Sequence, residues 1–112
     1  MTKEELYEKA VDAYAEGQLE DSVALYRQAL EIDPQYMDVL HGLARVLQDL
    51  GRLEEAEKTA KRLIEIDNDD VLAHTRLSMI YHDQGRIEDA EKEGNVAKIM
   101  GWKEELKKGK DS

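Results

Sequence analysis

The histidines of this sequence are its first candidates for metal ligands. They are His41, His74 and His82. His74 and His82 are eight residues apart, beyond the i, i+4 spacing that places two ligands on one face of a helix. His41 is much farther away along the chain. We therefore expect no metal site.

Three pairs of adjacent acids have the residue types of a catalytic carboxylate dyad. The sequence offers no Gly-rich phosphate loop, no Ser-His-Asp set and no His-Glu-x-x-His pattern to accompany them. In the first turn of a helix, acids interact favourably with the helix dipole. We interpret the pairs as helix starts, and we expect neither enzymatic activity nor a cofactor. The pairs are Glu20–Asp21, Glu54–Glu55 and Glu88–Asp89.

Composition limits the partners. The 112 residues include 26 acids and 16 bases, for a net charge of −10. That balance disfavours nucleic acid and anionic membranes, both of which attract clustered Lys and Arg. No cysteine is present, so disulfides and thiolate chemistry are excluded. With neither a signal-like apolar stretch nor a membrane-spanning run, we expect a single cytoplasmic domain.

The elements that must position any site repeat along the chain. Gly17, Gly51 and Gly85 are 34 residues apart, and each is followed by a polar residue, an aliphatic residue, two acids and a small residue. An amphipathic run precedes each glycine; Leu6 and Ala10 belong to the first. The pattern predicts helix, glycine turn and helix three times. The expected helices cover about residues 3–16, 19–32, 37–50, 53–66, 71–84 and 87–99.

Local sequence predicts where several helices begin and end. Thr2 and Glu5 form a capping-box pattern at the start of the first helix. Asp33-Pro34 should end the second helix, because proline cannot continue it. The acidic run 67–70 should end the fourth helix and cap the fifth.

This period and pattern resemble the tetratricopeptide repeat family. The resemblance covers repeats 3–36, 37–70 and 71–104. It implies an all-α, right-handed superhelix of six helices in one domain spanning 1–112. The stripe of Ile99, Trp102 and Leu106 predicts a short seventh capping helix at about 102–109, before a polar tail to 112. The family's small residues, which let paired helices approach closely, match Ala10, Ala44, Ser78, Ser22, Ala56 and Ala90.

Two departures from the family pattern concern the third repeat. His74 stands where the other repeats have Leu6 and Leu40, and we interpret it as a packing residue. Gly94 replaces a large family residue and should leave a hollow. We expect Trp102 to lean over that hollow and to be buried.

The resemblance also implies a binding surface. In this family the first helix of each repeat lines a concave groove that usually receives a protein or peptide segment. Arg45 and Tyr7 are the expected anchors, since Arg and Tyr are typical of binding hot spots. For Tyr14, simple packing and ligand contact are equally good interpretations. The expected groove residues are Tyr7, Val11, Tyr14, His41, Arg45, Gln48, Thr75, Arg76, Met79 and His82.

One subtype of the family binds the C-terminal carboxylate of chaperone tails through a clamp of Lys, Asn and Arg. The corresponding positions here are Tyr7, Val11, Gly42, Leu72 and Arg76, and only Arg76 fits. We therefore expect an adaptor that binds a protein or peptide partner without this clamp. The alternative is a self-assembling scaffold that forms a homo-oligomer through its repeat ends or its Gly94/Trp102 region.

Overall fold

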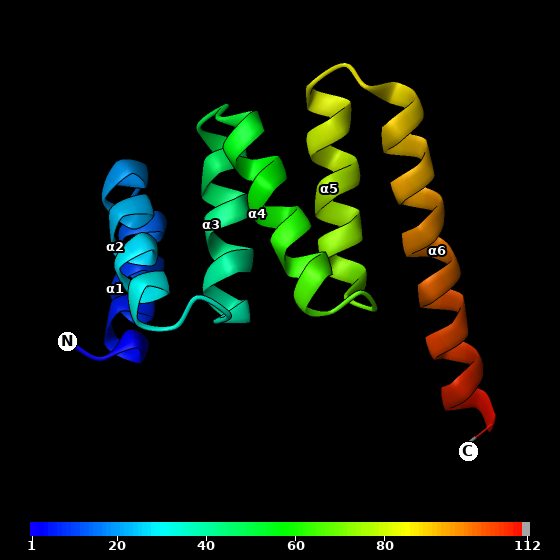
Figure 1. Ribbon diagram of the computed structural model, residues 1–112, viewed down its shortest axis with the longest axis horizontal. Coiled ribbons are helices and arrows are strands. Elements are labelled where there is room, and N and C mark those ends of the chain that lie inside the picture. Colours follow the sequence, from blue (N-terminus) through cyan, green and yellow to red (C-terminus); the bar gives the residue numbers. More distant parts are fainter. Residues whose placement is uncertain (111–112) are drawn as a thin grey trace.

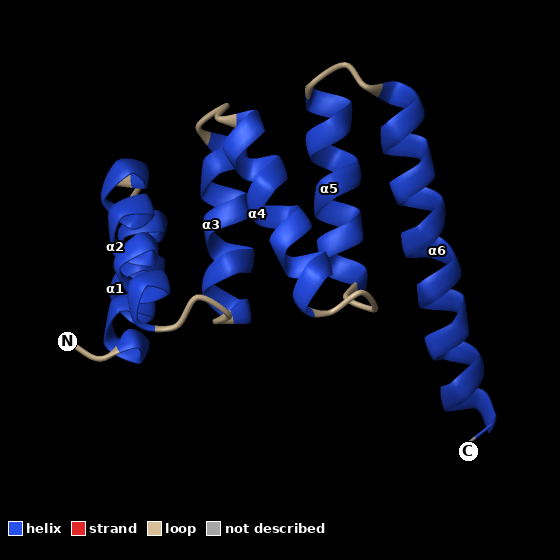
Figure 2. Ribbon diagram, in the orientation of Figure 1, coloured by secondary structure: helices blue, strands red, loops and turns tan. Residues whose placement is uncertain are grey.

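The computed structural model describes residues 1–110, which form six helices. Each helix packs antiparallel to its neighbour, so the chain forms three successive pairs (Figure 1), joined by short turns (Figure 2). Within the described residues, no helix is long and apolar enough to cross a membrane. The end of the predicted polar tail, residues 111–112, lies outside this description. The helices are α1 Lys3–Ala15, α2 Leu19–Ile32, α3 Met37–Asp49, α4 Leu53–Ile66, α5 Val71–Asp83 and α6 Ile87–Lys110.

The glycine turns explain the regular spacing of the pairs. Gly17, Gly51 and Gly85 have φ angles of 80°, 76° and 79°. Glycine enters this left-handed region without the steric cost that other residues incur, and it commonly ends helices there. One glycine per pair therefore reverses the chain at the same point of each repeat, as the sequence predicts.

The predicted helix caps are confirmed. The Thr2 hydroxyl accepts the Glu5 N–H at 3.1 Å, and Glu5 accepts the Thr2 N–H, which completes a capping box. The Asp70 carboxylate accepts the Ala73 N–H at 3.1 Å and caps α5. α2 ends at Ile32, ahead of Asp33-Pro34.

Small residues lie where the two helices of each pair come closest. In the first pair, the buried Ser22 hydroxyl donates to the Ala10 carbonyl at 2.8 Å. In the third pair the roles are exchanged, because Ser78 on the first helix donates to the Ala90 carbonyl at 2.7 Å. Large residues at these positions would separate the helices, so this contact fixes the geometry of each pair.

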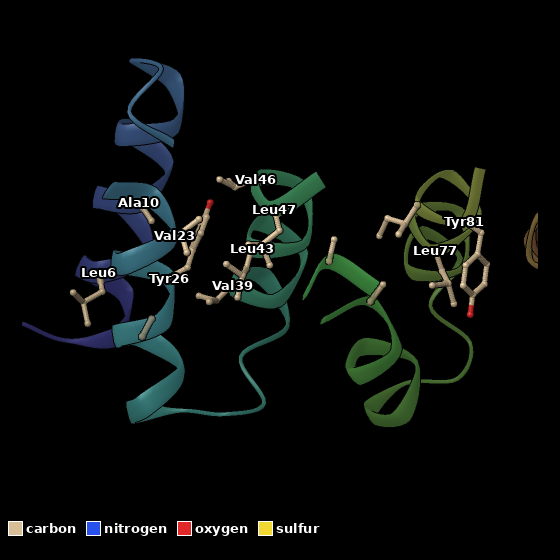
Figure 3. Packing of buried hydrophobic residues seen from close by; sticks show 14 of the residues in the cluster. Leu6, Ala10, Val23, Tyr26, Val39, Leu43, Val46, Leu47, Leu77 and Tyr81 are labelled. Atoms are coloured by element: carbon tan, nitrogen blue, oxygen red, sulfur yellow. The ribbon is translucent and has the colours of Figure 1, made fainter. Parts of the chain in front are cut away.

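The core lies between successive pairs. Figure 3 shows Val23 and Tyr26 of α2 beside Val39 and Leu43 of α3, and Leu6 of α1 belongs to the same cluster. Burial of such apolar surface is what makes the pairs stack, because an isolated pair would expose this face. The first helices α1, α3 and α5 consequently line up along one side of the molecule.

The C-terminal part of the chain differs from two expectations. There is no separate seventh helix in the described residues, because α6 continues without a break from Ile87 to Lys110. Trp102 is 64% exposed rather than buried, and Leu106 is 67% exposed. Residues 94 and 102 of one continuous helix lie about 12 Å apart along its axis, so Trp102 cannot fold back over Gly94. α6 instead runs on past the end of α5 (Figure 1).

Candidate functional site

A hollow of about 450 Å³ lies along the side formed by α1, α3 and α5, and we call it the groove. It brings together eight of the ten residues that the sequence predicts for this surface. Gln48 and His82 are the exceptions. The residues that line it are Tyr7, Val11, Tyr14, Tyr26, Asp38, His41, Gly42, Arg45, Val46, Leu72, Thr75, Arg76 and Met79.

Aromatic rings form the end of the groove nearest the N-terminus. Tyr7 lies between Tyr26 and Tyr36, with ring centroids 6.3 and 5.8 Å away. Tyr26 is 3% exposed, and burial raises the pKa of its hydroxyl. Gly42 of α3 faces this ring, and its missing side chain leaves room for the ring at the base of the groove. This end therefore presents a flat, mainly apolar surface.

Arg45 lines the groove from α3, the middle one of the three helices that form it. Its guanidinium stacks over the Tyr14 ring, with 5.0 Å between the guanidinium carbon and the ring centroid. The Tyr14 hydroxyl donates to the Asp49 carboxylate, and this bond, with partial burial, raises the pKa of Tyr14. Tyr14 thus both packs and orients Arg45, whose side chain remains exposed.

His41 has a partner that the sequence did not reveal. One of its ring nitrogens lies 2.7 Å from Asp70 Oδ2, while the other oxygen of that carboxylate caps α5. The Asp70 carboxylate thus connects the groove side of α3 to the start of α5.

Gln48 lies at the edge of the groove, where it links two repeats. Its amide donates to Asp83 at 2.9 Å and accepts from Arg76 at 3.0 Å. One Arg76 N–H therefore already has an acceptor within the protein. His82, the other residue outside the groove, lines a second hollow between α5 and α6.

Exposed apolar side chains lie around Arg45. Val11 is 40% exposed, Met79 is 47% exposed and Leu72 is 69% exposed. Sequence reasoning named Val11 and Met79 but used Leu72 only as a mismatch to the carboxylate clamp. The signal for Leu72 is its place one turn before Thr75, on the groove side of α5.

The third histidine serves packing, as predicted. His74 is 5% exposed, and its two ring nitrogens lie 2.6 Å from Glu93 and 3.0 Å from the Asn68 carbonyl. Burial lowers the pKa of His74, but the Glu93 and Asn68 acceptors outweigh it, so the pKa is raised overall. Among residues 1–110, no cluster of three or more His, Asp or Glu side chains could hold a metal ion.

The acid pairs also occupy the places that the sequence predicts. Each lies in the first turn of the second helix of its repeat, in α2, α4 and α6. There the carboxylates face the positive end of the helix dipole. This arrangement stabilises the helices without bringing two carboxylates to a common site.

Solved structures with the same fold are numerous but distant in sequence. MamA matches with a TM-score of 0.90 at 17% identity, covering 94% of this chain and 61% of MamA. The Yersinia enterocolitica type III secretion translocator chaperone SycD matches at 0.83 and 19%, covering 88% and 74%. The second TPR of Spaghetti (RPAP3), bound to the HSP90 peptide SRMEEVD, matches at 0.83 and 17%, covering 89% and 93%. This chain thus spans about three fifths of MamA.

Sequence comparison identifies the family directly. No curated protein sequence matches the chain. The family model for the tetratricopeptide repeat matches residues 13–75, more than half of the chain. Together with the three helix pairs and their glycine turns, this match shows that the chain belongs to the tetratricopeptide repeat family.

Proposed function

We propose that this chain is a non-catalytic protein-interaction module that binds a segment of a partner protein in the groove. The observation behind this proposal is the group of exposed apolar side chains around Arg45, contributed by α1 and α5. Such a group on an exposed surface is typical of binding sites. The RPAP3 domain of the same fold was solved with a bound peptide, which supports this use of the fold.

The groove suits a particular kind of segment. Apolar side chains of the ligand would pack on Val11, Leu72 and Met79, and one carboxylate or carbonyl would pair with Arg45. Asp38 at the edge favours a basic flank. Binding in a preformed groove needs little rearrangement, so we expect moderate affinity and fast exchange.

A free C-terminal carboxylate is a poor ligand for this groove. The clamp positions hold tyrosine, valine, glycine and leucine, and Arg76 donates to Gln48 instead of standing free. Titration of the peptide SRMEEVD should therefore give no saturable binding. Tight binding of this peptide that is lost on amidation of its C-terminus would contradict this part of the proposal.

The test starts from a peptide selected against the chain from a random display library. Isothermal titration should show that Arg45→Glu weakens binding of that peptide by roughly tenfold or more, about 1.4 kcal/mol. Tyr7→Ala should weaken it as well. Circular dichroism first establishes that both variants remain helical.

Lys58→Glu is the matched control, because Lys58 is an exposed residue of a second helix. It changes charge by the same amount as Arg45→Glu, and it should leave binding unchanged. If both groove variants bind like the parent while Lys58→Glu abolishes binding, the second helices carry the function and the groove does not.

A further inference from the structure

A second and larger hollow, of about 850 Å³, lies between α5 and α6. We call it the terminal slot, because no further helix pair stacks on it within the described residues. Its floor contains small residues, and its walls combine polar and apolar side chains. It is lined by Ser78, Met79, His82, Asp83, Ile87, Ala90, Glu91, Gly94, Asn95 and Lys98.

The 34-residue repeat shows what shape the slot accepts. Sixty-eight residues earlier in the sequence, the equivalents of Ile87, Ala90 and Gly94 are Leu19, Ser22 and Tyr26. Leu19 and Tyr26 belong to the core cluster that the first pair shares with α3. The equivalent surface of the second pair receives α5. By this symmetry, the terminal slot has the shape of a helix-docking surface.

Gly94 makes this slot roomier than the two filled ones. Its counterparts are Tyr26 in the first repeat and Ala60 in the second, both buried. A Cβ atom at Gly94 would approach only the Ser78 hydroxyl, at 3.3 Å. The ring that occupies the first interface is therefore absent here, and an occupant can supply a large side chain of its own.

Helix α1 of another copy does not suit the slot. The residues with which α3 enters the first interface include Val39, Leu43 and Val46, all buried. Their counterparts on α1 are Glu5, Lys9 and Asp12. Head-to-tail stacking would put three charged side chains where the filled interface has buried apolar ones, which is costly. An open chain of stacked copies is therefore disfavoured.

The C-terminal half of α6 has the apolar surface that α1 lacks. Ile99, Trp102 and Leu106 are 49%, 64% and 67% exposed, and they follow one another at helical spacing. At about 100° per residue, Ile99 and Leu106 point away from the buried Ala90 and Ala97. Trp102 lies about 80° around the helix from Gly94, so one face of α6 can present both residues. α6 has 24 residues against 13 in α5, and its C-terminal part extends beyond α5 (Figure 1).

Charge along α6 favours an antiparallel arrangement. Residues 87–97 contain four acids and one lysine, whereas residues 98–109 contain four lysines and two acids. Two antiparallel α6 helices would set the acidic half of each against the basic half of the other. Such complementarity favours this orientation over the parallel one.

Each of the two filled interfaces also pairs a basic side chain with an acidic one. An arginine of the following turn reaches back to an acid of the preceding repeat: Arg52 lies 2.7 Å from Glu20, and Arg86 lies 3.0 Å from Glu57. The counterparts of Glu20 and Glu57 at the terminal slot are Glu88 and Glu91, both exposed. The lysines in the second half of another α6 are suitable partners for them.

We propose that a second copy of this chain fills the terminal slot, with the two α6 helices antiparallel and Trp102 of each copy packed against Gly94 of the other. Gly94 and Trp102 are each four residues from Lys98. A two-fold axis near Lys98 therefore places Gly94 of one copy opposite Trp102 of the other. The long aliphatic stem of Lys98 lets each ammonium group reach solvent beside the axis. The contact is isologous and closed, so assembly stops at the dimer.

Trp102 is the chain's one tryptophan, so its fluorescence reports this contact directly. Sedimentation and light scattering of the full chain from micromolar to millimolar concentration should show a monomer–dimer equilibrium. Trp102 emission should shift from a water-exposed to a buried wavelength in step with the dimer fraction. Trp102→Ala should weaken dimerisation roughly thirtyfold or more, as expected for loss of an aromatic anchor.

Three further variants test the slot and exclude general effects. Gly94→Leu should fill the slot, keep the chain monomeric and leave Trp102 exposed at every concentration, with the circular dichroism unchanged. Ile32→Ala truncates another exposed apolar residue, on α2, and should dimerise like the parent. Arg45→Glu should also dimerise normally, which separates this contact from the groove.

Three results would overturn the proposal. The first is a parent chain that stays monomeric at millimolar concentration with Trp102 exposed. The second is a dimer that persists unchanged in Trp102→Ala and Gly94→Leu. The third is an oligomer that grows without limit, which would indicate stacking through α1.

Discussion

Replacing Gly42 with alanine should destabilise the fold, although alanine is the better helix former. A Cβ atom at this position would lie 2.5 Å from both Cζ and the hydroxyl oxygen of Tyr26, and 3.0 Å from Cε1. Separations of this size are far inside van der Waals contact, so α3 or the ring must move. Tyr26 is 3% exposed and packs against Tyr7, which leaves the ring little room.

The size of the effect follows from two opposing terms. Overpacking a well-packed core costs about 1–3 kcal/mol. Replacing a glycine with alanine in the interior of a helix stabilises the helix by about 1 kcal/mol. Gly42→Ala should therefore lower the free energy of unfolding by about 1 kcal/mol. Because Tyr26 lies at the base of the groove, the same change should also weaken binding of a groove ligand.

Gly94→Ala is the matched control, since it makes the same replacement within α6. Its Cβ atom would approach one atom, the Ser78 hydroxyl oxygen, at 3.3 Å. Stability should stay level or rise by up to about 1 kcal/mol. Urea unfolding followed by circular dichroism at micromolar concentration measures both variants. In a Tyr26→Leu background, the penalty of Gly42→Ala should shrink. A Gly42→Ala protein as stable as the parent would refute this account of the Gly42–Tyr26 contact.

Two further predictions concern charge. The Glu93 and Asn68 acceptors outweigh burial and raise the pKa of His74, so protonation of His74 stabilises the native state. This stabilisation should be complete below about pH 6.5, the pKa of an unfolded histidine. It should disappear as the pH rises through the higher pKa of the folded state. Urea unfolding between about pH 6 and pH 9 should show a steeper loss of stability in the parent than in His74→Leu, and equal slopes would contradict the role of His74. With a net charge of −10, self-repulsion should be appreciable at low ionic strength, so adding salt to about 0.15 M should leave the melting temperature unchanged or raise it. A clear drop would instead mean that attractive ion pairs between helices, such as Arg52–Glu20, dominate.

The sequence predicts the helices well because their signals are local. Apolar spacing, the glycine at each turn and the caps at Thr2 and Asp70 depend on residues a few positions apart. The repeat then extends this information to the stacking, since equivalent residues occupy equivalent interfaces. For the same reason the positions of Tyr7, Arg45 and Met79 along the groove could be predicted.

Side-chain contacts between helices could not be predicted in the same way. The run 67–70 was expected to cap α5, but the contact of the second Asp70 oxygen with His41 depends on how α5 lies against α3. The Glu93 partner of His74 likewise depends on the register of α5 and α6. Whether the groove residues bind a ligand, and whether the chain lacks enzymatic activity, stay predictions.

The burial of Trp102 was predicted from an incorrect helix boundary. Covering Gly94 within one chain requires the helix to end before Trp102 and fold back. Gly101 was the available break, but a single glycine costs a helix only about 1 kcal/mol. Good helix formers follow it, and α6 continues through this position. The stripe of Ile99, Trp102 and Leu106 was correctly recognised, but it faces outward.

The two links at the edge of the groove have an evolutionary consequence. Tyr14 bonds Asp49 and Gln48 bonds Asp83, so the same pair of positions is connected across successive repeats. His82 is the next residue in this series. An in-frame tandem duplication of codons 37–70 would keep the edge link, because Gln48 of one copy would face the equivalent of Asp49 in the next, and it would lengthen the groove by one repeat. Recombination within such a gene can therefore change the length of the groove by whole repeats.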